Sequence, residues 1–292
     1  MNGFLCVLKP PGMTSSDVVV RVRRKLGKGA KVGHAGTLDP EASGVLPLMI
    51  GRAARLFDYL VDKEKMYVAQ LKPGYATDTQ DAHGAIIAGE GVRASKEQLE
   101  RVLPQFIGEI AQIPPMYSAL KRDGQKLCDL ARQGVEVQIE PRPTQVHAID
   151  ILHEQEDGSF ILAIRCGRGT YIRTLCNDIG DAVGCKAHMG MLLRTQTGMF
   201  TLDDAHTVEE IDAAEDLSPM LVEMDQPLGH LPRLDIRPEA ERFARNGNRL
   251  TRRELIGDIH QGKPTRLYLN GQFCGLGRFD GDGLKFDAML LE

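Results

Sequence analysis

The sequence predicts an α+β protein with a large first domain on a mixed, mainly antiparallel sheet, followed by a small, mostly β domain. Three observations favour this class. Strand-like and helix-like segments alternate without βαβ regularity. Hairpin turn signals recur at 157–158, 270–271 and 280–281. The chain has 292 residues, 42% of them hydrophobic, which suffices for one large or two ordinary domains.

The first sixty residues predict two strands and two helices. The apolar run 4–8 stops at a Pro-Pro-Gly turn and indicates a strand. From Ser16, the expected N-cap, apolar residues recur every four positions up to Gly27, which predicts one amphipathic helix. A second apolar run, 45–50, precedes a short predicted helix at 53–60.

The middle of the chain continues the mixture. Residues 65–71 alternate as a strand does, and a capping box at Ser95 opens a helix that ends before Gly108. Two β-rich runs, 146–152 and 160–166, flank an Asp-Gly turn and predict a hairpin. A helix over 171–183 follows, stopped by a glycine.

A change of character marks the domain boundary. A capping box at Thr207 opens an acidic stretch, and three prolines between 219 and 232 indicate a connector. We expect a first domain at 1–232, with an acidic connector at 201–232, and a small domain at 233–292.

Charge is unevenly distributed. The net charge is -4, with a pI near 6.1, which at face value disfavours a nucleic-acid partner. Residues 201–232 hold nine acids and no Lys or Arg, however, so this stretch alone sets the sign. Residues 21–31 hold six bases without an acid. This run indicates either a solvated helix face or phosphate contact, and we expect the connector to face away from any such partner.

Several classes are excluded by missing signals. The longest early apolar run has five residues, and no later run approaches a membrane span, so we expect a cytoplasmic chain without a membrane partner. The six cysteines form no C-x-x-C pair and predict buried, unpaired thiols. No G-K-[ST] loop, complete G-x-G-x-x-G or His pair at i, i+4 is present, so we expect no cofactor and no metal.

The densest candidate for chemistry is the loop 33–47. It combines His34, three glycines and Asp39, and the following Pro40 biases the aspartate away from the helical region. Such a loop can hold one carboxylate stiffly, although an isolated Asp-Pro more often forms a plain turn. Glu41 is its only close acidic neighbour, which gives no support to a glycosidase pair.

This loop resembles the signature of the TruB family of tRNA pseudouridine synthases. Other family segments are matched in the same order, at 9–15, 65–67, 115–121, 131–134, 167–174 and 184–194. Residues 233–292 are similar to the PUA domain of bacterial members, an RNA-binding domain. The resemblance implies a catalytic domain of the pseudouridine synthase type.

The implied reaction converts uridine-55 in the T-loop of tRNA to pseudouridine. The uracil is cut from N1, turned and rejoined to the ribose through C5, which needs no cofactor or metal. The implied partner is tRNA, through its T-loop and acceptor arm, with no obligatory protein partner and a monomeric chain. The residues 121–134 match an insertion that closes over the T-loop.

The resemblance also implies roles for individual residues. Asp39 matches the catalytic aspartate, which can attack C1′, add to uracil C6 or assist a glycal route. Arg173 matches the arginine that pairs with it and keeps it oriented. The sequence does not choose among the three routes given for Asp39.

The remaining implied site residues bind the uridine. Tyr67 matches the tyrosine that stacks on uracil, and His34 matches the histidine that helps flip the base out. Tyr171 and Leu192 match residues that line the pocket. A strand tyrosine or a leucine in an apolar run is otherwise ordinary core. Lys9 would support the loop or contact phosphate, and a solvated lysine before a turn is nearly as good an interpretation.

Two rival functions fit parts of the pattern. A guide-RNA-dependent relative shares the catalytic domain but usually carries terminal extensions. A non-catalytic RNA-binding or RNA-folding protein would not need the carboxylate of Asp39 facing RNA phosphate.

Overall fold

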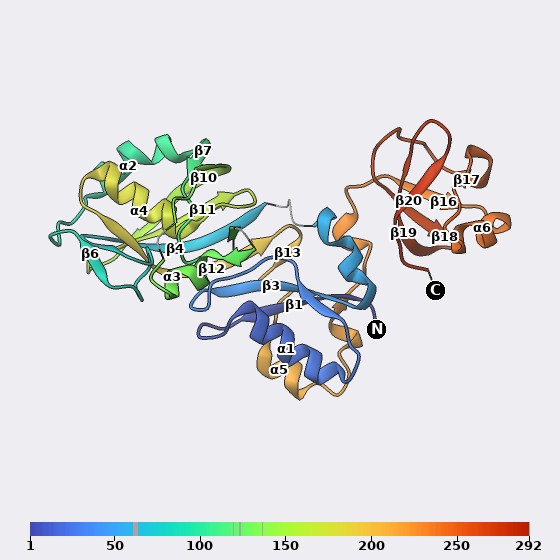
Figure 1. The fold of residues 1–292 in the computed structure, drawn as a ribbon, viewed down its shortest axis with the longest axis horizontal. Helices are drawn as coiled ribbons and strands as arrows, with labels where there is room; N and C mark the ends of the chain where they lie inside the picture. The colour runs from blue at the N-terminus through green and yellow to red at the C-terminus, as the bar shows by residue number, and fades with distance from the viewer. Residues whose placement is uncertain (61–63, 119, 123, 136, 292) are drawn as a thin grey trace.

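The computed structural model describes residues 1–60, 64–118, 120–122, 124–135 and 137–291, and it shows two separate main sheets (Figure 1). The larger sheet has the order β14-β1-β3-β12-β4-β11-β10-β7. Its strands are β1 (Gly3–Lys9), β3 (Ser43–Ile50), β4 (Lys65–Pro73), β7 (Gly108–Gln112), β10 (Arg142–Glu154), β11 (Phe160–Cys166), β12 (Ala187–Thr197) and β14 (His206–Thr207). Short strands β2 (Val32–His34), β13 (Phe200–Thr201) and β15 (Leu221–Val222) pair along its side.

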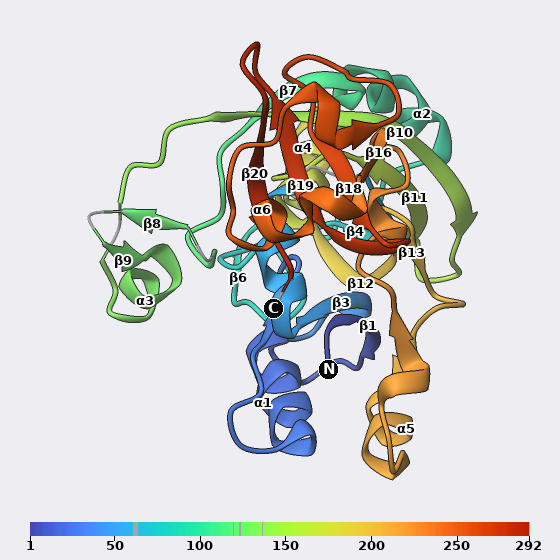
Figure 2. The same ribbon diagram turned by 90° about the vertical axis from the view of Figure 1, so that its right-hand side faces the viewer.

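Helices cover this sheet and two small hairpins extend from it. The helices are α1 (Ser15–Leu26), α2 (Lys96–Val102), α4 (Ile172–Val183) and α5 (Val208–Ala213), with 3-10 turns η1 (Gly51–Tyr59), η2 (Leu103–Phe106), η3 (Ser218–Met220) and η4 (Gln226–Leu228). One hairpin joins β5 (Ala76–Thr77) to β6 (Ile86–Ala88), and the other joins β8 (Lys121–Arg122) to β9 (Gln125–Lys126), followed by α3 (Leu127–Arg132). In Figure 2 the β8–β9 hairpin and α3 stand away from the larger sheet.

The second sheet lies in the C-terminal part and has the order β17-β16-β18-β19-β20. Its strands are β16 (Arg233–Ile236), β17 (Leu255–Ile256), β18 (Thr265–Leu269), β19 (Gln272–Phe279) and β20 (Leu284–Met289), with α6 (Glu241–Arg245) and 3-10 turns η5 (Pro238–Ala240) and η6 (Arg252–Glu254). Within the described residues, strands of the larger sheet end at Val222 and those of the second begin at Arg233. The division into 1–232 and 233–292 stays a proposal.

The predicted α+β class is confirmed. In the larger sheet, pairings are antiparallel except for β1 with β14 and β12 with β3. The predicted strand at 65–71 forms all but the last two residues of β4, and the expected hairpin joins β10 to β11. The capping boxes at Ser95 and Thr207 are both present. The predicted helix over 171–183 is α4, which ends at Gly184 in the left-handed conformation.

Two helix predictions need correction. Thr14, not Ser16, is the N-cap of α1: its hydroxyl accepts from the Asp17 N–H at 3.0 Å, and Asp17 accepts from the Thr14 N–H at 2.9 Å. The box therefore closes two residues before the predicted cap. The short helix expected at 53–60 is the 3-10 helix η1, which starts at Gly51.

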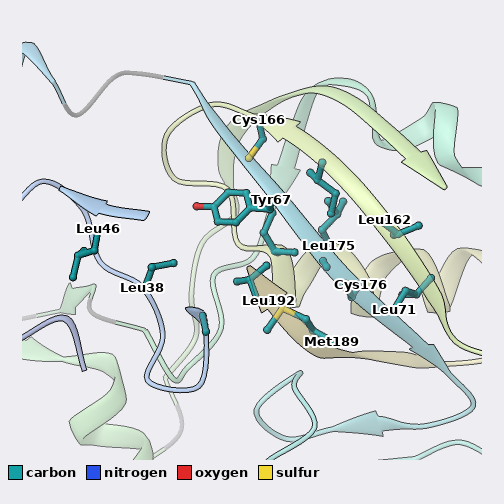
Figure 3. Close-up of a cluster of buried hydrophobic side chains, with 14 of the residues drawn as sticks. Leu38, Leu46, Tyr67, Leu71, Leu162, Cys166, Leu175, Cys176, Met189 and Leu192 are labelled. Carbon is teal, nitrogen blue, oxygen red and sulfur yellow. The ribbon is translucent and has the colours of Figure 1, made fainter. Parts of the chain in front are cut away.

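The core between the sheet and α4 is apolar. Phe160, Leu162 and Leu71 are almost completely buried, and Leu175 contributes from α4 (Figure 3). Burying an aliphatic side chain of this size stabilises the fold by about 1.5–3 kcal/mol. A rigid sheet thus lies behind the side chains that project from β4 and β12.

The acidic connector lies beside α1, so it contacts the basic run directly. Asp212 of α5 pairs with Arg21, and Lys25 donates to the backbone oxygen of Asp212 at 2.7 Å. Opposite charges draw the two segments together, so part of the basic run is neutralised within the chain. Arg23 also makes a contact within the chain, donating to the backbone oxygen of Val32 at 3.0 Å.

The two sheets contact each other through η1. Leu290 and Ala288 share an apolar cluster with Phe4 and Leu56. Arg52 also donates to the backbone oxygen of Leu290 at 2.7 Å. This interface fixes the second sheet beside η1.

The cysteines agree with the predicted unpaired thiols. All six are free, and five are buried. Burial raises the pKa of Cys6, Cys176 and Cys274 to about 12, so these thiols are not nucleophiles near neutral pH. Within the described residues no helix is both long and apolar enough to span a bilayer.

Candidate active site

Asp39 lies in a loop that joins β2 to β3, here named the Asp39 loop (residues 35–42). Its backbone oxygen accepts from the Ala42 N–H at 3.1 Å, which makes a turn around Pro40. The carboxylate itself remains 36% exposed, whereas the neighbouring Leu38 is buried. The loop therefore anchors on one side and presents a carboxylate on the other.

Lys9 is the first anchor of this loop. It is completely buried, and its ammonium donates to the backbone oxygens of Pro10, Met13 and Pro40 at 2.7, 2.6 and 2.8 Å. Burial lowers the pKa of Lys9 from 10.5 to about 8. Of the interpretations offered from the sequence, loop support fits these contacts, whereas phosphate contact and a solvated side chain are wrong because Lys9 has no exposed surface.

Ser15 and Arg194 are further anchors. The Ser15 hydroxyl accepts from the Leu38 N–H at 2.9 Å, directly before Asp39. Arg194, only 1% exposed, donates to the oxygens of Thr37 at 3.1 Å and Val45 at 2.8 Å. Gly44 allows this approach, because an added Cβ there would lie 2.1 Å from the Arg194 oxygen. Buried donors thus fix the loop at both ends.

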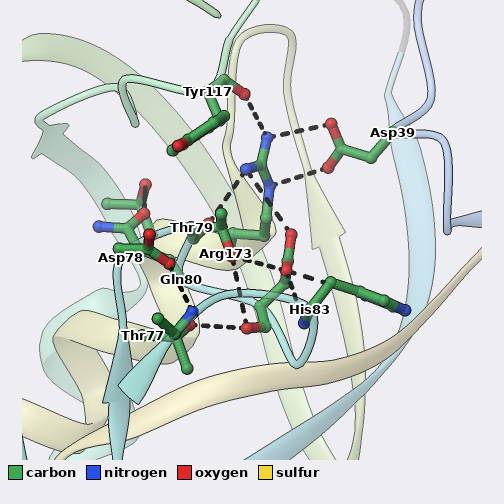
Figure 4. Close-up of polar contacts among 11 residues, drawn as sticks. Asp39, Thr77, Asp78, Thr79, Gln80, His83, Tyr117 and Arg173 are labelled. Atoms are coloured by element: carbon green, nitrogen blue, oxygen red, sulfur yellow. Dashed lines mark hydrogen bonds and ion pairs between the residues drawn. The ribbon is translucent and has the colours of Figure 1, made fainter. Parts of the chain in front are cut away.

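The Asp39 carboxylate is paired in a bidentate manner with Arg173. The Arg173 Nε lies 2.9 Å from Oδ2, and Nη2 lies 3.0 Å from Oδ1 (Figure 4). The arginine side chain is 5% exposed and the carboxylate 36% exposed. Such a fork fixes the plane of the carboxylate as well as its position. The remaining lone pairs of Asp39 stay open to a substrate.

Arg173 also ties two other segments to this pair. It donates to the oxygen of Thr79 at 3.1 Å and to the oxygen of Tyr117 at 2.9 Å. Its Nη1 lies 3.8 Å from an oxygen of Asp81, a second carboxylate. One guanidinium therefore links Asp39, the loop after β5 and the chain that leads into the β8–β9 hairpin.

The loop after β5, residues 78–85, is held by its own hydrogen bonds. Asp81 accepts from the Thr79 hydroxyl at 2.7 Å and from the His83 N–H at 3.0 Å. Thr174 of α4 donates to the Gln80 side chain at 2.8 Å. This loop therefore stays against α4 and keeps Asp81 facing Arg173.

Tyr67 projects from β4 beside the Asp39 loop. Tyr67 pairs in register with Arg194 on the neighbouring strand β12. In Figure 3 the Tyr67 hydroxyl points toward the side where Leu38 lies. The tyrosine is 7% exposed, and burial raises its pKa while the Arg194 charge opposes that shift. The phenol is therefore neutral near physiological pH.

The other predicted binding residues surround this position at different depths. Leu192 is buried on β12, in the same core cluster as Tyr67. Tyr171 caps α4, and its N–H donates to the Gln112 side chain at 3.0 Å. Burial raises the pKa of Tyr171, and the charges of Arg173 and Asp39 both act on it. It is thus a half-buried phenol near the ion pair.

His34 ends β2 and is half-buried. Its Nδ1 is buried and has no hydrogen-bond partner within the described part of the chain. Burial lowers the pKa of His34, as does the nearby Arg194 charge. A neutral imidazole with an unsatisfied nitrogen is suited to a polar group that arrives with a substrate.

Sequence reasoning missed three residues of this arrangement. Ser15 and Arg194 both fall inside family segments, at 9–15 and 184–194, but no local pattern gives either of them a role. Asp81 follows a Thr-Asp-Thr run that resembles an ordinary polar loop. Ser15 and Arg194 are buried polar side chains, and Asp81 is partly buried. Their positions depend on contacts with residues far along the chain, so the sequence carries no local signal for them.

The predicted RNA-closing segment 121–134 contains the β8–β9 hairpin and α3, while residue 123 lies outside the described residues. Its base is next to Tyr117, which accepts from Arg173. The segment is therefore connected through the backbone to the Asp39–Arg173 pair.

The fold has close structural relatives. A chain from an H/ACA ribonucleoprotein bound to a substrate RNA containing 2′-deoxyuridine aligns with a TM-score of 0.73 at 24% identity, covering 99% of this chain and 85% of that one. A chain from a Cbf5–Nop10–Gar1 complex aligns with a TM-score of 0.70 at 28% identity, covering 99% and 84%.

Sequence comparisons agree with the fold. Residues 23–172 match the model of the TruB family pseudouridylate synthase N-terminal domain, and 173–228 match the tRNA pseudouridylate synthase B C-terminal domain. A protein named tRNA pseudouridine synthase B from Alkaliphilus oremlandii is 45% identical over 95% of this chain and 93% of its own length. Its namesake from Dechloromonas aromatica is 42% identical over 100% and 96%.

Fold and sequence thus define a pseudouridine synthase, an isomerase. The chain belongs to the TruB family of these enzymes.

Proposed function

We propose that this enzyme isomerises uridine-55 in the T-loop of tRNA to pseudouridine. The observation that carries the proposal is the bidentate Asp39–Arg173 pair, with an accessible carboxylate on a loop fixed by buried donors. The substrate is proposed because the relatives at 45% and 42% identity are named tRNA pseudouridine synthase B.

Asp39 is the proposed catalytic residue. It would act on the ribose C1′ or on uracil C6, or assist a glycal route, and each route requires an oriented, accessible carboxylate. The two N–H groups of Arg173 hold that orientation, while the carboxylate remains 36% exposed toward the substrate side. Arg173 is thus a positioning residue, since it reaches the substrate only through Asp39.

The target base would be flipped out of the T-loop, at a cost of a few kcal/mol. We propose that Tyr67 stacks on the uracil, with Tyr171 and Leu192 against its other edges. His34, with its unsatisfied Nδ1, would fill the space that the base leaves. A neutral phenol and an apolar floor suit an uncharged ring.

The buried anchors have a proposed role in preorganisation. Lys9, Ser15 and Arg194 hold the backbone on both sides of Asp39 without touching the substrate side. A carboxylate fixed before the substrate arrives loses little freedom when it reacts. The reaction is an isomerisation, so atoms and charge balance without any added reactant.

The test uses the purified chain and an unmodified tRNA transcript that carries tritium at uridine C5. Replacement of that hydrogen during pseudouridine formation releases tritium to water. We expect release with the native protein, none with Asp39→Asn, and near-native release with Glu41→Gln, a matched change two residues away. No release with the native protein, or unchanged release with Asp39→Asn, would refute the proposal.

A second candidate is a guide-RNA-dependent activity. The fold likeness to the chain from a Cbf5–Nop10–Gar1 complex favours it. The same assay separates the two, because a stand-alone enzyme modifies the transcript without any guide RNA or added protein. A transcript with cytidine at position 55 is the control for position.

A further inference from the structure

A buried serine hydroxyl beside the site has no hydrogen-bond partner. Ser118 is 5% exposed, and its Oγ forms no hydrogen bond of normal geometry within the described residues. A buried polar group without a partner destabilises the folded state, and each such group needs an explanation, such as a functional role. The chemistry proposed above does not use Ser118, so the reason for this hydroxyl lies elsewhere.

The backbone around Ser118 is fixed from two sides. Arg173 donates to the oxygen of Tyr117 at 2.9 Å, which ties this segment to the ion pair (Figure 4). The Cys128 N–H, in α3, donates to the oxygen of Ser118 at 3.1 Å. The Ser118 N–H itself donates to the oxygen of Met116 at 2.9 Å, in a tight turn. The Ser118 side chain is therefore held in place between the ion pair and α3.

The group on which Ser118 acts is the phenol of Tyr171. Burial raises the pKa of Tyr171, and the Ser118 side chain opposes that shift. A hydroxyl lowers the pKa of a phenol when it donates to the phenol oxygen, because that hydrogen bond stabilises the phenolate. The direction of the effect therefore makes Ser118 the donor and Tyr171 the acceptor.

The backbone of Tyr171 is fixed by a second buried side chain. The Tyr171 N–H donates to Gln112 Oε1 at 3.0 Å, and Gln112 Nε2 donates to the Tyr171 backbone oxygen at 3.3 Å. Gln112 is itself buried at the end of β7, where it pairs in register with Arg142 of β10. These contacts place the start of the tyrosine side chain but leave its O–H free to rotate.

The direction of the Tyr171 O–H decides what the phenol can bind. A phenol that accepts from one neighbour points its own hydrogen away from that neighbour, toward another acceptor. Uracil offers two carbonyl oxygens as acceptors. If Tyr171 instead donated to Ser118, the phenol would present only a lone pair to the ring and would bind neither carbonyl. A donor at Ser118 thus selects the orientation in which the phenol binds a carbonyl oxygen.

We propose that Ser118 is a positioning residue of the reaction: when the base is bound, its hydroxyl donates to the Tyr171 oxygen, and the Tyr171 O–H donates to a uracil carbonyl. This inference rests on the proposed function, which places uracil beside Tyr171. Ser118 does not touch the substrate and acts through Tyr171 alone. Its hydroxyl, without a partner in the described residues of the free chain, gains one in the complex.

The first experiment separates this role from a structural one. Ser118→Ala is compared with Ser159→Ala, a buried serine directly before β11, at the end of that strand remote from the site. The Ser159 hydroxyl is hydrogen-bonded to the side chains of Gln70 and Gln155, at 2.9 and 2.6 Å. Single-turnover tritium release from the tRNA transcript gives the rate of each variant, and urea unfolding gives its midpoint.

We expect Ser118→Ala to lower the rate about 2- to 12-fold, the equivalent of one neutral hydrogen bond. Its urea midpoint should equal or exceed that of the native protein, because the lost hydroxyl has no partner within the described residues. Ser159→Ala should lower the midpoint and leave the rate unchanged. An unchanged rate in Ser118→Ala, or a lower rate together with a lower midpoint, would overturn the proposal.

A double-mutant cycle tests whether Ser118 acts through Tyr171. Tyr171→Phe removes the phenol hydroxyl and should lower the rate at least as much as Ser118→Ala does. In the Tyr171→Phe background, Ser118→Ala should lower the rate by less than about two-fold, because the hydroxyl that it positions is already gone. Losses that multiply in the double variant would show two independent effects and would contradict the proposal.

The third experiment observes the phenol itself, in an Asp39→Asn background with a T-arm RNA bound. The chain has six tyrosines, so 3-fluorotyrosine labelling gives six fluorine resonances in an NMR spectrum, and Tyr171→Phe identifies that of Tyr171. We expect Ser118→Ala to shift this resonance in the RNA complex and to leave the other five in place. An unshifted resonance would overturn the proposal. If the native protein released no tritium, the proposed function would fail, whereas this spectrum would still be readable.

Discussion

Replacing Arg173 with lysine is the most informative single change in the site. The guanidinium makes two contacts with Asp39, at 2.9 and 3.0 Å, and donates to the oxygens of Thr79 and Tyr117. Lysine keeps the positive charge, but its ammonium is a single point and cannot form the planar fork. The variant therefore separates orientation of the carboxylate from its neutralisation.

The size of the effect follows from the hydrogen bonds that the substitution removes. A lysine at position 173 retains at most one of the two hydrogen bonds with Asp39 and leaves at least one backbone oxygen without its donor. Two charge-assisted hydrogen bonds correspond to about 3–6 kcal/mol. Because each 1.36 kcal/mol of transition-state stabilisation is ten-fold in rate, we expect the rate of modification to fall about 150- to 25,000-fold.

The assay is single-turnover tritium release with enzyme in excess over tRNA, accompanied by a filter-binding measurement of tRNA affinity. We expect the rate to fall while the affinity stays within about two-fold, because Arg173 is only 5% exposed. Arg165→Lys, at a surface arginine 3.4 Å from Glu64, is the matched control. A loss below about five-fold, or a loss equal to that of the control, would refute the positioning role of Arg173.

Three further changes test the surrounding structure. Asp81→Asn removes a carboxylate charge 3.8 Å from Arg173. We expect a single-turnover rate that is roughly ten-fold lower, with unchanged tRNA affinity. An unchanged rate would contradict a role of Asp81 in holding Arg173. Gly44→Ala places a Cβ 2.1 Å from the Arg194 backbone oxygen, at a φ of +115° that favours glycine. We expect urea unfolding to show a free energy of unfolding lower by about 3 kcal/mol or more. The control Gly167→Ala, where an added Cβ has no contact under 3.5 Å, should lower it far less. For Lys9, whose pKa is lowered from 10.5 to about 8, the folded state loses its proton before the unfolded chain does, so the free energy of unfolding rises between these values. Relative to Lys9→Met, the native protein should gain about 3 kcal/mol between pH 8 and 10.5 in urea unfolding, and a constant difference would refute the shift.

Local signals predicted most of the fold. Alternation and hairpin turns place β4, β10 and β11, because a strand's period and an Asp-Gly turn depend on a few neighbouring residues. The N-cap of α1 was misplaced because Thr14, Ser15 and Ser16 are chemically similar caps. The cap falls on Thr14 because the Ser15 side chain is taken by Leu38, 23 residues away.

The site was predictable only in part. The glycine and proline pattern around Asp39 indicates a stiff loop, and the family resemblance pointed to Arg173. That Lys9 is buried, and that Arg194 reaches back to Thr37, follows from strand pairing across the sheet. Such contacts join residues far apart in sequence, so no local pattern announces them.

The charge distribution was likewise predictable within each segment, whereas the contacts between the segments were not. The counts correctly identify the acidic connector and the basic run as separate segments of opposite sign. Their meeting, in the Arg21–Asp212 pair, depends on β1 pairing with β14 and bringing α5 beside α1. Part of the basic run is thus committed to contacts within the chain.

The central claim is that this chain alone, through Asp39, forms pseudouridine at one position of tRNA. The most direct measurement is nucleotide-resolution mapping of pseudouridine by carbodiimide labelling and primer extension, after an unmodified transcript is incubated with the purified protein and no guide RNA. The account predicts a single stop that reports position 55 with the native protein and none with Asp39→Asn. A stop at another position, or the same stop with Asp39→Asn, would contradict it.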